Sequence, residues 1–141
     1  VYRTLDDPRA GSKSGQGTLA WGNNRGGDIV GGYIDSTSAM HGFVLHNGVY
    51  STLDAPQAGS GAQQGTWAVG LNAQGDIVGP YVDSTGAQHG FLLHKGLFTT
   101  IVDPQGSPTI PYSIDDQGDI VGGYGGVGFP DQTAHAFLYT P

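Results

Sequence analysis

Two short segments decide the fold of this chain: residues 75–83, with the sequence GDIVGPYVD, and residues 89–94, with the sequence HGFLLH. Both are rich in β-branched, aromatic and other apolar residues, which favour extended strands, and a polar turn separates them. The pair occurs three times along the chain, which indicates a series of repeated β units. The other two copies cover residues 27–35 with 41–46, and residues 118–124 with 135–139.

The first two copies align without a gap at a spacing of 48 positions. In the third copy the loop after Pro104 is shorter, and the segment between Tyr124 and His135 is longer. We therefore interpret residues 1–141 as one repeat domain, because this length is enough for one ordinary domain with a moderate core. Its units cover approximately residues 1–48, 49–96 and 97–141.

Each unit is expected to hold four short strands, two of which are the repeated segments. The chain meets the outermost strand of each unit first, so the units are permuted by one strand. We expect these outermost strands at residues 1–5, 49–53 and 97–102, each ended by a proline. The innermost strands are expected at residues 18–22, 66–71 and 109–114, and alternating apolar residues are clear in the last two copies. No helical periodicity interrupts this pattern, so almost no helix is expected.

Four antiparallel strands in a unit of this length predict an all-β fold with blades of the β-propeller type. The chain opens with an outermost strand and ends one strand short, so residues 1–5 are expected to close the last sheet beside Phe137. Closed propellers have roughly four to eight blades. Three blades therefore suggest a dimer that forms a six-bladed ring, or a filament. The alternative is a three-sheet β-prism or β-trefoil.

The composition excludes several functional classes. All twelve acidic residues are Asp, Lys and Arg together number five, and the formal net charge is −7. Nucleic acids and anionic membranes attract basic proteins, so neither is an expected partner. No apolar run is long enough to cross a membrane. The absence of cysteine excludes disulfides and thiol catalysis, and no cofactor is expected.

The second copy of the motif resembles the bacterial HAF repeat family, which is named for a His-Ala-Phe triplet. The residues that carry the resemblance run from Asn72 through the two repeated segments to Pro104. The triplet occurs literally at residues 135–137, and Gly replaces its Ala at positions 42 and 90. The resemblance implies a secreted bacterial protein built from β units. It implies no established reaction and supplies no catalytic residues.

Each unit also repeats a tyrosine, an aspartate and a histidine. Repeated clusters of this kind are typical of small lectins with one shallow sugar site per unit, whereas the alternative is that each tyrosine packs between neighbouring sheets. The three histidines could also meet on an axis and bind zinc, but bonds within each unit are the favoured interpretation, and no metal site is expected. The candidate ligand-binding residues are Tyr33, Asp35, His41, Tyr81, Asp83, His89, Tyr124, Asp131 and His135.

An enzyme is not expected, because an Asp–His pair needs a nucleophile to become catalytic and catalytic groups are rarely triplicated along a chain. The sequence favours an extracellular structural or adhesive module that forms homo-oligomers by sharing β-strands. The alternative hypothesis is a multivalent carbohydrate-binding lectin with one weak site per unit.

Overall fold

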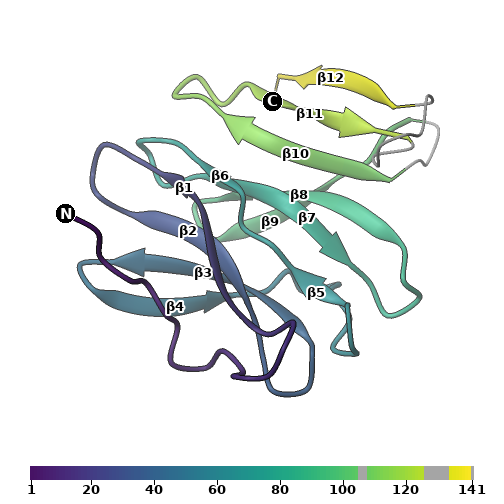
Figure 1. Cartoon of the computed structure of the whole chain (residues 1–141). Coiled ribbons are helices and arrows are strands. Elements are labelled where there is room, and N and C mark those ends of the chain that lie inside the picture. Colours follow the sequence, from purple (N-terminus) through teal and green to yellow (C-terminus); the bar gives the residue numbers. More distant parts are fainter. Residues whose placement is uncertain (105–107, 126–133, 141) are drawn as a thin grey trace.

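The computed structural model describes residues 1–104, 108–125 and 134–140. These residues form twelve strands and no helix, so the all-β expectation is confirmed (Figure 1). The described residues therefore contain no helix long and apolar enough to cross a membrane. The strands fall into a nine-stranded sheet and a three-stranded sheet. Neither group of described strands closes into a barrel, so the described residues do not form a trefoil barrel.

The first four strands are antiparallel neighbours in chain order, and we call this group meander 1. Tight polar turns join them, including an Asn-Gly turn at residues 47–48, where both residues have positive φ angles. This conformation matches the twist of a two-residue hairpin, and Asn and Gly tolerate it best. The strands are β1 (Gly17–Asn23), β2 (Ile29–Ile34), β3 (Met40–His46) and β4 (Val49–Leu53).

Meander 2 repeats this order, with its first strand in two pieces. It consists of β5 (Gly65–Thr66), β6 (Gly70–Leu71), β7 (Ile77–Val82), β8 (Gln88–His94) and β9 (Leu97–Ile101).

The innermost strand of meander 2, expected to be continuous over residues 66–71, is interrupted opposite Pro80. The N–H groups of Trp67 and Val69 still donate to the carbonyls of Pro80 and Val78, at 3.0 and 2.9 Å. Proline has no N–H to return a bond, so the ladder between the two pieces is incomplete.

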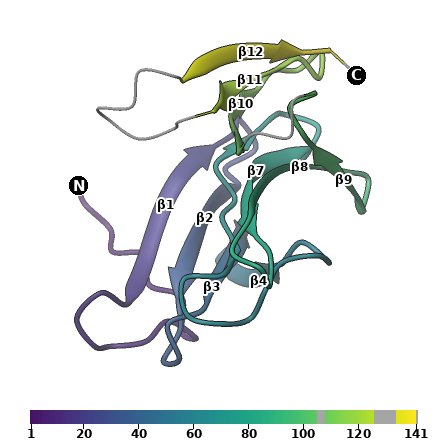
Figure 2. The same cartoon turned by 90° about the vertical axis from the view of Figure 1, so that its right-hand side faces the viewer.

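Meander 3 has three described strands: β10 (Thr109–Ile114), β11 (Ile120–Tyr124) and β12 (His135–Tyr139). They form a layer of their own beside meander 2, as Figures 1 and 2 both show. The second and third strands of each meander pair in the same register. The matching cross-strand partners are Tyr33 with His41, Tyr81 with His89, and Tyr124 with His135.

Apolar side chains from adjacent meanders form the core. Meanders 1 and 2 meet around Val30, Leu53, Ala68 and Phe91, and a single parallel bridge also joins their sheets. Meanders 2 and 3 meet around a second cluster that includes Val78, Ile101, Ile114 and Ile120. Each meander thus buries one face of its sheet against the next.

The expected pairing of the N-terminal strand is wrong for the single chain. Residues 1–5 form no strand, and Val1 and Tyr2 are fully exposed. Leu5 packs against meander 1 near Phe43, and the N-terminus lies far from β12 in both views (Figures 1 and 2). The reason is geometric, because three stacked meanders leave the first and last sheets apart. Among the described residues, β12 pairs only with β11.

Candidate functional site

The repeated tyrosines and histidines come together in the structure. They are cross-strand neighbours on the second and third strands of each meander, so their rings stack in all three copies. The ring centroids lie 4.9, 5.1 and 5.1 Å apart, with interplanar angles of 20°, 30° and 26°.

The repeated aspartates complete this arrangement in the first two meanders. Oδ2 of Asp83 lies 3.0 Å from Nε2 of His89, and Oδ2 of Asp35 lies 3.5 Å from Nε2 of His41. Asp131, the third predicted member, lies outside the described residues. Tyrosine, aspartate and histidine are therefore neighbours in the two copies where all three are described.

Burial of the tyrosines argues against stacking on a sugar ring. Tyr33 is 4% exposed and Tyr81 is 3% exposed. Their hydroxyl groups lie 3.1 Å from Oγ1 of Thr52 and 3.3 Å from Oγ1 of Thr100, on the neighbouring outer strand. Each tyrosine therefore joins the strands of its own meander and fills space between sheets, which supports the packing interpretation.

The aspartate in each of these clusters organises a turn. Oδ1 of Asp83 accepts hydrogen bonds from the backbone N–H and the hydroxyl of Thr85, at 2.8 and 2.6 Å, and from the N–H of Ala87. The bonds from the Thr85 hydroxyl and from His89 hold the pKa of Asp83 well below its ordinary value. The Thr85 hydroxyl thus donates to the carboxylate, so it is not positioned as a nucleophile beside the imidazole.

Asp35 is held in the same way in meander 1. Burial pushes the pKa of Asp35 upward, but hydrogen bonds from Thr37, Ala39 and His41 outweigh it and lower the pKa overall. Nδ1 of His41 also lies 2.9 Å from Oδ2 of Asp54. These imidazoles are therefore held by carboxylates in their own meander, and no group of three or more metal-ligating side chains occurs in the described part of the chain.

Sequence reasoning missed an asparagine ladder that ties the three meanders together. Nδ2 of Asn24 donates to the backbone carbonyl of Asn72 at 3.2 Å, and Nδ2 of Asn72 donates to the carbonyl of Asp115 at 3.0 Å. These residues occupy the same turn in successive meanders. Their spacing in the sequence is the signal that could have revealed the ladder, although asparagine in a turn usually indicates only a local bond.

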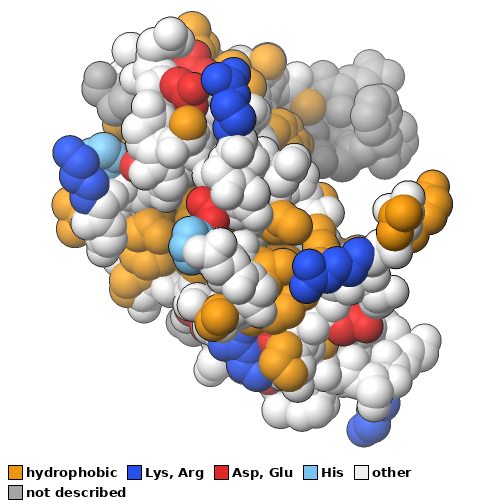
Figure 3. Space-filling model, turned by 90° about the vertical axis from the view of Figure 1, so that its left-hand side faces the viewer, with side chains coloured by type: hydrophobic (Ala, Val, Ile, Leu, Met, Phe, Trp, Pro, Cys, Tyr) orange, Lys and Arg blue, Asp and Glu red, His pale blue; other side chains and the backbone are white. Residues whose placement is uncertain are grey.

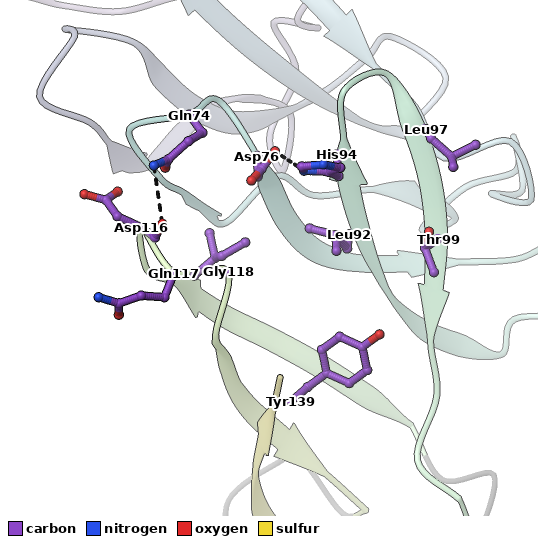
Figure 4. Close-up of a pocket in the computed structure, with 11 residues that line it drawn as sticks. Gln74, Asp76, Leu92, His94, Leu97, Thr99, Asp116, Gln117, Gly118 and Tyr139 are labelled. Atoms are coloured by element: carbon purple, nitrogen blue, oxygen red, sulfur yellow. Dashed lines mark hydrogen bonds and ion pairs between the residues drawn. The ribbon is translucent and has the colours of Figure 1, made fainter. Parts of the chain in front are cut away.

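A groove between meanders 2 and 3 was also missed. It has a volume of about 430 Å³, and Figure 4 shows Asp76 and His94 on one side with Asp116 and Tyr139 on the other. Oδ1 of Asp76 lies 2.7 Å from Nδ1 of His94. The groove combines carboxylates, amides and an aromatic ring, which are the groups that bind hydroxyl-rich ligands.

The chain was compared with protein-family models, with curated proteins and with solved structures, and nothing matched in any of the three comparisons.

Proposed function

We propose that this protein is a non-enzymatic, extracellular structural or adhesive module that associates with further copies of itself by sharing β-strands. The observation that carries the proposal is the place taken by the N-terminal segment, residues 1–6. The resemblance of the chain to secreted HAF repeats supports the proposal that the protein is exported.

The N-terminal segment lies where the outer strand of a preceding meander would lie. Leu53 ends β4 and Ile101 ends β9, and each packs against the following meander. Leu5 stands 48 positions before Leu53 and packs in the same way against meander 1. The apolar contact that a fourth strand makes is therefore present, although residues 1–5 form no strand in the single chain.

The other end of the stack has the complementary gap. Meander 3 has no fourth strand among the described residues, so the outer edge of β12 has unpaired backbone groups. An open edge of this kind is a template for another strand. The N-terminal segment of a second copy has the sequence position and the apolar contact to fill it, and six blade-like meanders from two chains are enough for a propeller ring.

Removal of residues 1–6, with light scattering across a concentration series, tests the proposal. We expect the full chain to form dimers or larger assemblies and the shortened chain to be monomeric. Leu5→Asp is a milder form of the same test, and Thr4→Asp, at an exposed position, is its matched control. An unchanged mass for the shortened chain would refute strand sharing.

Carbohydrate binding is the second candidate function. The groove between meanders 2 and 3 is a better sugar site than the buried tyrosines, because its aromatic side chain, that of Tyr139, is open to solvent. Tyr139 lines this groove, whereas Tyr112 is similarly exposed but does not line it. A glycan array should therefore show binding that Tyr139→Ala removes and Tyr112→Ala retains. An array without any signal would exclude this candidate.

A further inference from the structure

We infer that copies of this chain join head to tail, with Arg25 in meander 1 of one copy facing Asp115 in meander 3 of the next. The inference rests on the proposed self-association and specifies its surfaces and polarity. It commits to a second copy of this chain as the occupant of the open face of meander 3.

The open face of meander 3 matches the faces that are buried inside the chain. Val30 and Val78 are completely buried at the two internal junctions, whereas Val121, at the same position, is 48% exposed. Leu92 is buried, whereas the corresponding Leu138 is 65% exposed. Meander 3 therefore presents an apolar sheet face that has no partner among the described residues.

Meander 1, at the opposite end of the stack, exposes on β1 the kind of side chain that could pack on the open face of meander 3. At the first internal junction the ring of Trp67 lies so close to Gly32 that a Cβ there would overlap it. Leu19 of β1 corresponds to Trp67 and is about half exposed, and Gly123 corresponds to Gly32. A Cβ on Gly123 would have no neighbour nearer than 3.5 Å, so the cradle for Leu19 is open.

The face of the molecule on the N-terminal side also exposes apolar side chains. Figure 3 shows apolar side chains open to solvent between Lys and Arg side chains on that face. Leu19 of β1 is about half exposed, whereas Trp21 packs edge-on against Trp67 of meander 2, with ring centroids 4.8 Å apart, and so belongs to the first internal junction.

Charge is divided between the two ends of the chain. Four of the five Lys and Arg residues lie within residues 1–25, whereas residues 97–141 contain five Asp and neither Lys nor Arg. A chain with a net charge of −7 repels its own copies unless opposite charges meet locally. Head-to-tail contact brings the basic end of one copy to the acidic end of the next, whereas head-to-head contact does not.

The asparagine ladder identifies which charges meet. The carboxylate side chain of Asp115 has no N–H to donate, so the ladder cannot continue beyond meander 3 as an amide–carbonyl bond. At the second internal junction the N–H of Ala73 donates to Oδ1 of Asp116 at 2.9 Å, so corresponding turn residues of adjacent meanders touch. The residue of meander 1 that corresponds to Ala73 is Arg25. Its guanidinium would therefore replace the missing amide by pairing with the carboxylate of Asp115.

Charge reversal at the junction provides the test. The association constant is measured by sedimentation equilibrium for the wild type, Arg25→Glu and Lys95→Glu. The two variants change the net charge equally, and Lys95 lies in the exposed β8–β9 turn of meander 2, away from both ends of the stack. We expect Arg25→Glu to weaken association ~10-fold or more and Lys95→Glu to leave it nearly unchanged.

An apolar pair provides an independent arm. Leu138→Asp should abolish association, whereas Val49→Asp, at a position with the same exposure of 65%, should not. Both positions are solvent-exposed in the single chain, so melting curves should confirm that both variants fold.

The outcomes separate the two proposals. If both variants of each pair weaken association equally, or if neither variant weakens it, the head-to-tail junction is overturned but self-association is not. A wild-type chain that stays monomeric at all concentrations overturns both.

Discussion

Replacement of Asn72 tests whether the ladder between meanders contributes to stability. Its side chain is buried and makes four hydrogen bonds. Oδ1 accepts from the N–H groups of Asp76 and Gln74, at 2.9 and 3.1 Å, and Nδ2 donates to Oδ2 of Asp76 and to the carbonyl of Asp115, each at 3.0 Å. At about 1 kcal/mol net for each bond, Asn72→Ala should lower the free energy of unfolding by about 3–4 kcal/mol.

Asn72→Asp isolates the donated bonds, because it keeps the shape and the acceptor but loses the N–H groups. At pH 7 its second oxygen faces the carboxylate of Asp76 and the carbonyl of Asp115, so we expect a loss of about 2–3 kcal/mol. In acid the protonated carboxyl regains one donor, so the difference from wild type should shrink.

Urea denaturation at a concentration where the chain is monomeric measures these losses. Asn24→Asp is the matched control, since its side chain makes the same kind of contact but is only half-buried, and its loss should be smaller. If Asn72→Asp is as stable as wild type at pH 7, the ladder does not stabilise the junction between meanders, and Arg25 of a second copy has no such bond to replace.

Three further predictions concern other parts of the fold. Gly79→Ala should lower the unfolding free energy by about 3 kcal/mol in the same assay, because its Cβ would overlap the backbone carbonyl of Trp67, which cannot rotate away. Folding lowers the pKa of Asp83. The contribution of Asp83 to folding stability is therefore complete at pH values above its ordinary pKa of 3.8, and it is lost as the pH falls through the lower folded-state pKa. The stability difference between wild type and Asp83→Asn should therefore narrow below about pH 4, and a constant difference would contradict this assignment. Ser113→Gly should strengthen association in sedimentation experiments, because Ser113 occupies the position where glycine permits close approach at the internal junctions; unchanged or weaker association would argue against that contact.

The strands and the pairs within each unit could be predicted because they depend on local features. Tyr81 lies opposite His89 because the polar turn at residues 83–86 joins β7 to β8, and the turn between two adjacent strands sets their register. The broken strand opposite Pro80 could not be predicted from the missing N–H alone, because β10 contains Pro111 and is continuous.

The sequence by itself determined an all-β chain of similar units and the partners inside each one. Only the tertiary structure decided which faces those units bury, that Tyr33 and Tyr81 are inaccessible to a sugar ring, and that residues 1–5 do not reach β12. The physical reason is that strand pairing is specified by neighbouring residues in the chain. The angle at which one sheet stacks on the next depends instead on contacts such as that of Trp67 with Gly32, which join residues far apart in sequence.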